Sequence, residues 1–276
     1  MAEPFSLLMS VYGGDDPEHL RDAFRSVVQE QTRPPDDVVL VQDGPVPDGL
    51  QKVIDELMED SPTPVTLLAL EVNVGLGLAL DRGLAACAHD IVARMDADDI
   101  ALPQRFEVQI PIVEGGVDLV GSALLEFGVD PDDIVGKRVP PIDPAEIVRF
   151  SRFAQPFNHP TVVYRRTAVE RAGGYRHLAL MEDYLLFARM IAQGVTVGNV
   201  AEPLVLYRVG AGAYARRGGF AMLRSEVALQ RQLHGIGFTS RTQFARNVVI
   251  RGTYRLVPES LRRVAYRRLI ARRGER

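Results

Sequence analysis

The chain has 276 residues, of which 46% are hydrophobic and 25% charged, an ordinary balance for a globular protein and enough for one large α/β domain with an appendage. Its single cysteine, Cys87, excludes an internal disulfide framework and suits a reducing compartment. No apolar run approaches the roughly 18 residues that a membrane span needs, and residues 1–4 lack the basic start of a secretory signal. We therefore expect a cytoplasmic protein, or one held peripherally at the inner face of the cell membrane.

The net charge of -4 hides an uneven distribution. Residues 216–276 contain fifteen arginines and three acids, about +12, which leaves about -16 on residues 1–215. An acidic body with a basic tail indicates that the two parts of the chain have different roles. We predict a main domain over residues 1–215 and a basic, mainly helical C-terminal extension over residues 216–276.

Strands and helices are predicted to alternate four times in the first half of the chain. Residues 5–11 are nearly all apolar, as in a central parallel strand, and Asp16 with Pro17 marks the start of a helix. This alternation predicts a parallel, doubly wound sheet. The other strands expected here are 37–42, 65–70 and a fourth that ends at an acidic cluster, and the other helices are roughly 48–59 and 75–88.

The second half is predicted to be less regular. Its expected strands are 117–125, 161–164, 195–200 and 203–208, its expected helices are 144–153, 166–172 and one that starts at Glu182, and residues 128–143 read as a Pro/Asp/Gly-rich loop.

Three carboxylates follow the fourth strand within four residues, at Asp96, Asp98 and Asp99. Burying them without a partner would cost several kcal/mol, so we expect a cation at this strand end. Mg²⁺ or Mn²⁺ fits, because oxygen ligands suit these ions and they commonly bind through one or two carboxylates plus substrate phosphates. The alternative is an exposed acidic turn in which Asp99 caps the next helix.

Other common site motifs are missing from the sequence. No G-x-G-x-x-G follows the first strand, and there is no P-loop, no G-x-S-x-G elbow and no zinc-ligand spacing of histidines. Ligands of doubly wound sheets bind beyond the carboxyl ends of the strands. Each of those four ends carries acidic or amide side chains, so we expect them to meet at one crevice.

Seven motifs in order closely resemble the inverting family 2 glycosyltransferases with the GT-A fold, especially bacterial members that build exopolysaccharide and cell-envelope glycans. The resemblance covers about residues 5–208 and implies an α/β, mostly parallel sheet flanked by helices. The motifs are SVYGGD (10–15), QDGPVPDG (42–49), NVGLGLALDRGL (73–84), ARMDADD (93–99), FNHPTVVYRR (157–166), GGYR (173–176) and MEDYLLFARMIAQG (181–194).

The resemblance assigns the first group of site residues to a nucleoside diphosphate sugar donor. Tyr12, Asp15 and Asp43 would hold the base and ribose, with Asn73 nearby. Asp43 is also a natural turn residue before Gly44, and one acid here where the family usually has two leaves the base open. Asp96, Asp98 and Asp99 match the D-x-D motif, which implies a Mn²⁺ or Mg²⁺ ion that bridges the diphosphate, with Asp96 and Asp98 also on the donor side.

The resemblance assigns the second group to catalysis and to the acceptor, which we expect to be a lipid-linked glycan. Asp183 matches the general base, which takes the proton of the acceptor hydroxyl, and Glu182 is its neighbour. The alternative is that both acids only favour a helix N-terminus. His159 is expected on the acceptor side, or bonded to backbone before Pro160.

The basic tail carries two further predictions. Arg216 and Arg217 precede a pair of glycines and would form a lid over the donor, unless they are a plain linker. An imperfectly amphipathic, Arg-rich helix over residues 261–273 would lie on an anionic membrane surface. No motif favours nucleic acid.

Two other functions stay open at this point. A sugar-1-phosphate nucleotidyltransferase would need a basic glycine-rich loop after the first strand, where residues 13–16 are acidic instead. A non-catalytic, membrane-associated binding protein with the same fold would show no metal-dependent nucleotide binding.

Overall fold

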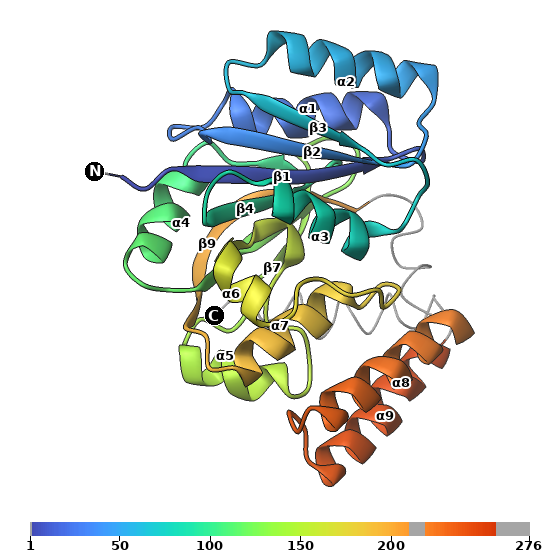
Figure 1. The fold of residues 1–276 in the computed structure, drawn as a ribbon. Coiled ribbons are helices and arrows are strands. Elements are labelled where there is room, and N and C mark those ends of the chain that lie inside the picture. Colours follow the sequence, from blue (N-terminus) through green and yellow to red (C-terminus); the bar gives the residue numbers. More distant parts are fainter. Residues whose placement is uncertain (1, 210–218, 258–276) are drawn as a thin grey trace.

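The computed structural model describes residues 2–209 and 219–257, which form one sheet with helices on both faces (Figure 1). The strand order is β3-β2-β1-β4-β8-β6-β9-β5, and β7 pairs with β6. Arg216, Arg217 and the predicted helix over residues 261–273 lie outside the described residues, so the lid and the membrane helix stay predictions, and so does the domain boundary at residues 215/216.

The first four large strands are parallel, as the alternating pattern predicts. Asp16 caps the first helix, since its side chain accepts the backbone N–H groups of Glu18 and His19. The elements are β1 (Phe5–Tyr12), α1 (Pro17–Val28), β2 (Asp37–Asp43), α2 (Asp48–Asp60), β3 (Val65–Ala69), α3 (Leu76–Ala86) and β4 (Ile91–Asp96).

Each face of this half-sheet has its own hydrophobic core. Phe5, Leu7 and Met9 alternate along β1 and pack with α1 and α2. Leu8 points to the other face and joins α3 and the later helices, together with the buried Cys87. Both faces are therefore covered, which explains why β1 is apolar at nearly every position.

The second half of the sheet is mixed rather than parallel throughout. β8 runs antiparallel between β4 and β6, whereas β6 and β9 are parallel. The segment expected to be a loop over 128–143 contains β7, and the two strands expected over 195–208 form one strand whose register shifts near Pro203. These elements are β5 (Ile100–Ala101), β6 (Leu119–Phe127), β7 (Ile134–Arg138), β8 (Val163–Arg165) and β9 (Val197–Arg208).

One helix of the body was not predicted. α4 (Arg105–Glu114) contains Pro111, and its buried face includes the polar residues Arg105 and Gln109, so it lacks a clean apolar stripe. The other helices here are α5 (Pro144–Ser151), the 3₁₀ turn η1 (His159–Thr161), α6 (Arg166–Arg171) and α7 (Glu182–Ala192).

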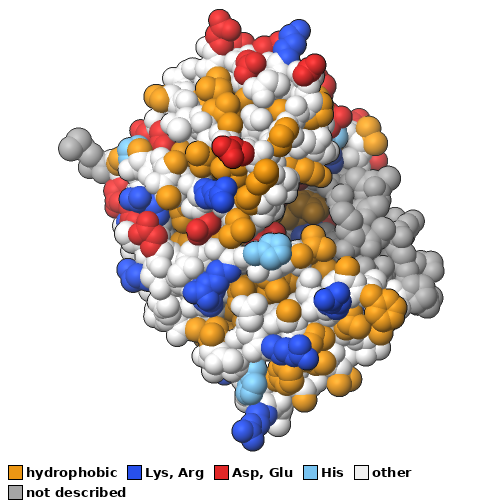
Figure 2. Space-filling view, turned by 45° about the vertical axis from the view of Figure 1, so that its right-hand side comes forward, with side chains coloured by type: hydrophobic (Ala, Val, Ile, Leu, Met, Phe, Trp, Pro, Cys, Tyr) orange, Lys and Arg blue, Asp and Glu red, His pale blue; other side chains and the backbone are white. Residues whose placement is uncertain are grey.

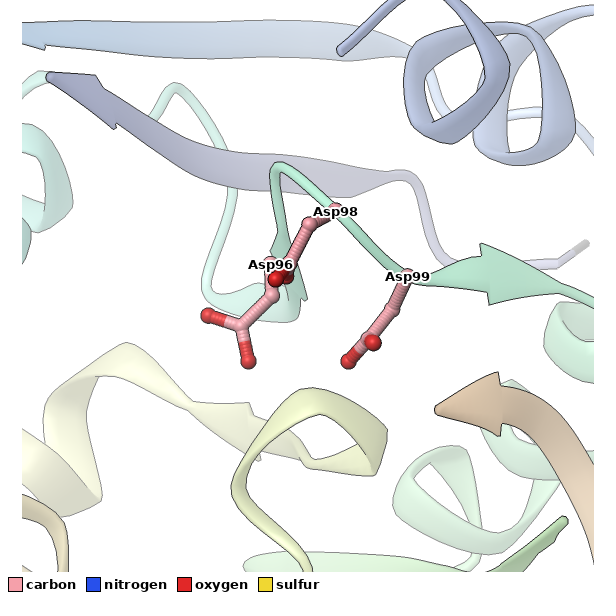
Figure 3. A group of neighbouring side chains, drawn as sticks. All are labelled: Asp96, Asp98 and Asp99. Carbon is pink, nitrogen blue, oxygen red and sulfur yellow. The ribbon is translucent and has the colours of Figure 1, made fainter. Parts of the chain in front are cut away.

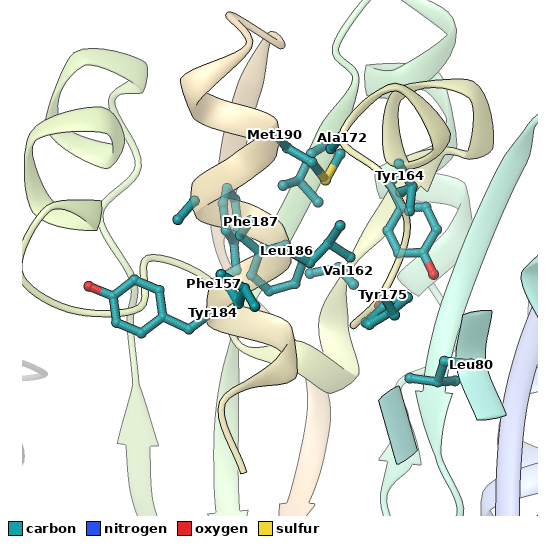
Figure 4. Packing of buried hydrophobic residues seen from close by; sticks show 14 of the residues in the cluster. Leu80, Phe157, Val162, Tyr164, Ala172, Tyr175, Tyr184, Leu186, Phe187 and Met190 are labelled. Atoms are coloured by element: carbon teal, nitrogen blue, oxygen red, sulfur yellow. The ribbon is translucent and has the colours of Figure 1, made fainter. Parts of the chain in front are cut away.

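α7 lies in the middle of the second core. In Figure 4, Leu186, Phe187 and Met190 belong to one packed group, whereas Tyr184 leaves α7 on another side. The hydroxyl of Tyr184 donates to the carbonyl oxygen of Ser151 at 2.9 Å. The first turn of α7 is thereby fixed against its neighbours.

Two helices follow the sheet, α8 (Phe220–Gly235) and α9 (Arg241–Leu256). Met222, Leu229 and Leu233 belong to the same hydrophobic core as α7, so this pair packs onto the body. On the face in Figure 2, acidic side chains gather toward the upper end and Lys/Arg side chains occupy the lower end. No helix within the described residues has both the length and the apolar character to cross a membrane.

Gly83 sets how closely α3 approaches the sheet. A Cβ atom at this position would lie 2.4 Å from Val41 Cγ2 and 2.6 Å from Leu8 Cδ1. We expect Gly83→Ala to lower the free energy of unfolding by about 1–3 kcal/mol, because the helix must shift. Urea denaturation measures this change.

Gly49→Ala on α2 is the matched control for Gly83→Ala. Its Cβ would meet nothing within 4 Å, and the φ angle of Gly49 is not positive. We expect a gain of about 0.4–1 kcal/mol from the stiffer unfolded chain. Equal effects at both positions would contradict the close packing of α3.

Candidate active site

The carboxyl ends of β2, β1 and β4 lie side by side, because these strands are adjacent and parallel. Beyond them is a cavity of about 300 Å³. The strand ends therefore meet at one crevice, as expected for a parallel sheet. The residues predicted for the donor that line this cavity are Tyr12, Asp15, Asp43, Asn73, Asp96 and Asp98.

Asp43 shapes the cavity through the loop between β3 and α3. Its Oδ1 accepts the N–H of Val74 at 2.7 Å, and its Oδ2 accepts the N–H of Gly75 at 3.0 Å. Asn73 Nδ2 donates to the backbone oxygen of Asp43 at 3.1 Å. A carboxylate has about four lone-pair sites, so Asp43 retains acceptor capacity beyond its part in the turn.

Asp15 is fixed in the same cavity, where its Oδ2 accepts the N–H of Tyr12 at 2.9 Å. The pKa of Asp15 is raised to about 6, mainly by burial and also by the charges of Asp98 and Asp96. The crevice therefore contains several carboxylates whose negative charges disfavour one another.

The three aspartates of the D-x-D segment project from the turn between β4 and β5 toward the same side (Figure 3). One ligand oxygen from each lies within 4.8 Å of the others. Asp99 is fully buried, so the exposed-turn alternative is wrong. Its Oδ1 accepts the N–H of Arg208 at 2.8 Å, and its Oδ2 has no hydrogen-bond partner among the described residues.

This cluster fits a hard divalent cation. Burial raises the pKa of Asp99 well above its usual range, and the charges of Asp96 and Asp98 add to that effect. Burial and then Asp96 also raise the pKa of Asp98. A buried carboxylate oxygen without a donor and two neighbouring carboxylates form an all-oxygen set of the kind that Mg²⁺ and Mn²⁺ prefer.

A second cavity of about 550 Å³ adjoins the first, and Asp96 and Leu76 line both. The first turn of α7 contributes Glu182 and Asp183 to its wall, and η1 contributes His159. The structure thus brings Asp96 of the D-x-D segment and the predicted catalytic acids to one cavity, although they are far apart in sequence.

Glu182 and Asp183 form a buried acid pair. Burial raises the pKa of Glu182 to about 7, and the charge of Asp183 adds to the rise. Burial also raises the pKa of Asp183, against hydrogen bonds that favour its carboxylate: Gln155 Nε2 donates at 2.6 Å and the N–H of Tyr184 at 2.6 Å. Both acids are in the first turn of α7, so the helix dipole also favours them.

His159 lies against Asp183 but is not a charged partner. Burial, and then the nearby charge of Arg94, lower the pKa of His159 well below its usual value. Its Nδ1 is 3.8 Å from Asp183 Oδ2, and its Nε2 makes a 3.1 Å hydrogen bond with the hydroxyl of Tyr175. The ring is therefore a neutral part of the cavity wall, and it does not take the alternative of bonding to backbone.

Arg94 on β4 is a buried cation of the site that no sequence motif predicted. Its side chain is 1% exposed, lines the second cavity and donates from Nη2 to Asp96. Its Nε and Nη1 are buried without a hydrogen-bond partner among the described residues. Burial alone would lower the pKa of Arg94, but the charge of Asp96, the hydrogen bond to Asp96 and the charge of Asp99 act together against it, and the pKa is raised. The available signal was the strand period, which puts residues 94 and 96 on one face.

Three other cavity residues were also missed, Gln155, Arg251 and Arg255. They come from the loop after α5 and from α9, and no motif in the sequence connects them with the acids of α7.

A nucleotide-sized cavity at parallel strand ends, with a D-x-D cluster beside a second acid pair, is the arrangement of a sugar transferase with the GT-A fold. Residues 6–173 match the family described as "Glycosyl transferase family 2". The chain belongs to this family and is a glycosyltransferase, so the nucleotidyltransferase alternative is set aside.

Relatives match over nearly their whole length. The amylovoran biosynthesis glycosyltransferase AmsE of Erwinia amylovora is 39% identical over 267 residues, which cover 95% of this chain and 97% of the relative. An Escherichia coli protein named UDP-Gal:alpha-D-GlcNAc-diphosphoundecaprenol beta-1,3-galactosyltransferase is 35% identical over 271 residues, 97% of each chain.

Similarity to a solved structure supports the fold. The crystal structure of S. aureus TarS 1-349 in complex with UDP-GlcNAc has a TM-score of 0.65 and 14% sequence identity, covering 96% of this chain and 75% of that one. The α/β GT-A fold predicted from the sequence motifs is therefore confirmed.

Arg94 compensates buried acids, so its loss should destabilise the fold. We expect Arg94→Met to lower the free energy of unfolding by about 3–5 kcal/mol, as for a buried ion pair that loses one partner. Urea denaturation in the presence of EDTA measures the change without bound metal.

The double variant Arg94→Met/Asp96→Asn is the control, because it removes the charge that Arg94 neutralises. It should recover more than half of the loss, which a double-mutant cycle reports as coupling. If the two changes are simply additive, Arg94 does not act through Asp96.

Proposed function

We propose that this glycosyltransferase is an inverting enzyme that moves one sugar from a nucleoside diphosphate sugar to a lipid-linked glycan acceptor, with Asp183 as general base. The observation that carries the proposal is that Asp96 and Asp183 line one cavity of about 550 Å³. The name of the E. coli relative, which gives a UDP-sugar and a sugar diphosphate lipid as substrates, supports both substrate classes.

The donor nucleotide would occupy the smaller cavity at the strand ends. Tyr12 offers a ring there that is 48% exposed, and Asp15 and Asp43 offer carboxylate oxygens to base or ribose donors. From this cavity the sugar would extend past Asp96 toward Asp183, because Asp96 lines both cavities.

Asp96, Asp98 and Asp99 would hold Mn²⁺ or Mg²⁺. Such an ion neutralises charge on the departing nucleoside diphosphate as a Lewis acid. Asp99 is the most buried of the three, and its Oδ2 has no donor within residues 2–209 and 219–257, so it is the residue whose loss should affect metal binding most.

Asp183 would act on the acceptor hydroxyl. Its carboxylate takes the hydroxyl proton while the acceptor oxygen bonds to the anomeric carbon on the face opposite the leaving diphosphate. The bond between that carbon and the diphosphate oxygen breaks, and the configuration inverts. Burial keeps the pKa of Asp183 above that of an ordinary aspartate, which makes it a better base.

A transfer assay tests this function. With a panel of nucleotide sugars, Mn²⁺ and a lipid-linked acceptor, we expect release of nucleoside diphosphate, which EDTA stops. Asp183→Asn should lower the rate by about 10²–10⁴, the usual contribution of a general base.

Calorimetry of nucleotide binding separates the role of Asp183 as base from that of Asp99 as metal ligand. Asp183→Asn should still bind nucleoside diphosphate with Mn²⁺, whereas Asp99→Asn should lose the Mn²⁺-dependent part of binding. If no donor is turned over and both variants behave like the parent protein, the proposed function is wrong.

The pH profile gives an independent check of Asp183. The base works only when ionised, so the rate should fall as the pH falls through its raised pKa. Gln155→Leu removes the 2.6 Å hydrogen bond that favours the carboxylate, so the acidic limb should move to higher pH.

Glu182→Gln should move the same limb the other way. The charges of Glu182 and Asp183 disfavour each other, so its removal lowers the pKa of Asp183. A limb that stays in place in both variants would exclude Asp183 as the titrating group.

A further inference from the structure

The larger cavity has a basic wall as well as an acidic one. Arg138 at the end of β7 and Arg251 and Arg255 on α9 line the same space as Asp183. Their side chains are 26%, 16% and 12% exposed. Three guanidinium groups are therefore present at the acceptor half of a site whose donor half is acidic.

The two arginines of α9 are held in place by one buried carboxylate. Glu226 on α8 is fully buried and accepts Arg251 Nε at 2.6 Å, Arg251 Nη2 at 3.0 Å and Arg255 Nη2 at 2.9 Å. Arg251 Nη1 also donates to the carbonyl oxygen of Phe153 at 3.1 Å. These bonds position both guanidinium groups before any ligand arrives, which reduces the entropy lost on binding.

Aromatic rings on the body also help to hold the arginines of this wall in place. The Arg251 guanidinium carbon is 5.5 Å from the centre of the Tyr184 ring, next in sequence to Asp183. The corresponding distance from Arg138 to Tyr207 is 4.9 Å, and Arg138 also pairs with Glu126. The basic wall is thus connected to the catalytic helix by direct contact.

Such a wall suits a phosphate group. A guanidinium has five N–H donors. Arg251 uses one from each of its three nitrogens, to Glu226 and Phe153, so it retains donors for a second anion, and its planar fork matches phosphate oxygens. In the proposed function the donor diphosphate lies beside Asp96, Asp98 and Asp99, which would hold its cation. A second phosphate site in the cavity therefore belongs to the acceptor.

We propose that Arg138, Arg251 and Arg255 form a subsite for a diphosphate on the acceptor. This inference rests on the proposed function and makes the acceptor a sugar joined directly to a lipid diphosphate, because one cavity holds both the base and the arginines. The diphosphate ester stays intact during transfer. The enzyme thus follows a reaction that transfers a sugar phosphate to a lipid phosphate.

Binding of farnesyl diphosphate to the full chain tests the subsite. Calorimetry is done with Mg²⁺ and saturating UDP, GDP and dTDP, which fill the donor side. We expect farnesyl diphosphate to bind and farnesol not to bind. Arg138→Gln and Arg251→Gln should each weaken binding about tenfold or more, the effect of losing a charge-assisted hydrogen bond.

Arg246→Gln is the matched control, because it makes the same charge change on α9 outside this cavity. Arg246 lies over the ring of Phe153 and lines a separate hollow with α5. The affinity of the Arg246→Gln variant for farnesyl diphosphate should equal that of the parent protein. Equal weakening in all three variants would mean general attraction of an anion to a basic surface and would overturn the proposal.

Folding is checked in the same samples by thermal unfolding. Arg251→Lys keeps the charge beside Glu226 and should retain more affinity than Arg251→Gln, and Arg138→Gln changes a different element. The comparison of farnesyl diphosphate with farnesol on the parent protein needs no variant, and equal binding of the two overturns the subsite.

The two proposals fail separately. Binding is measured without transfer, so arginine-dependent diphosphate binding in a protein that turns over no donor would reject only the proposed function. Transfer to neutral glycosides together with diphosphate binding that ignores the arginines would reject only the subsite.

Discussion

The active site depends on one buried cation among many acids. Arg94 is 1% exposed and donates to Asp96, and its charge favours the ionised forms of Glu182 and Asp183. Burial, and then the charge of Arg94, lower the pKa of His159. Carboxylates buried without such a partner would cost several kcal/mol. The same residue also supports the fold, because its backbone oxygen accepts Arg105 Nη2 at 2.7 Å. Arg94 therefore contributes both to the charge balance of the site and to the packing of α4 against the sheet.

In the helix pair α8 and α9 a buried charge is also neutralised by partners of opposite sign, but the buried charge is negative. Here one buried acid, Glu226, holds two arginines, and hydrogen bonds from Arg251 and Arg255 keep the pKa of Glu226 low despite its burial. This cluster contacts Tyr184 at the start of α7. Arg251 and Arg255 of α9 therefore line the cavity beside Asp183, and α8 packs against the core that contains α7.

Local pattern predicted the first half of the fold well, because β1 to β4 are buried strands of regular length between amphipathic helices. It failed where side chains break the pattern. α4 buries Arg105 and Gln109 on a face that would normally be apolar, and Pro111 lies inside it. β7 is mostly exposed, so it shows no hydrophobic alternation. The antiparallel direction of β8 follows from its partners β4 and β6, which no local signal specifies.

The sequence alone determined the family, the parallel half-sheet and the acids at its strand ends. These features depend on motifs and on residue spacing within single elements, which neighbouring residues specify. Only the tertiary structure decided that Asp99 is buried with an oxygen unpaired in the described part of the chain, that Arg94 pairs with Asp96 in the wall of the Asp183 cavity, and that arginines of α9 line this cavity. These relations join residues from distant parts of the chain. Burial and charge pairing arise from how whole elements pack, and a one-dimensional pattern does not encode that packing.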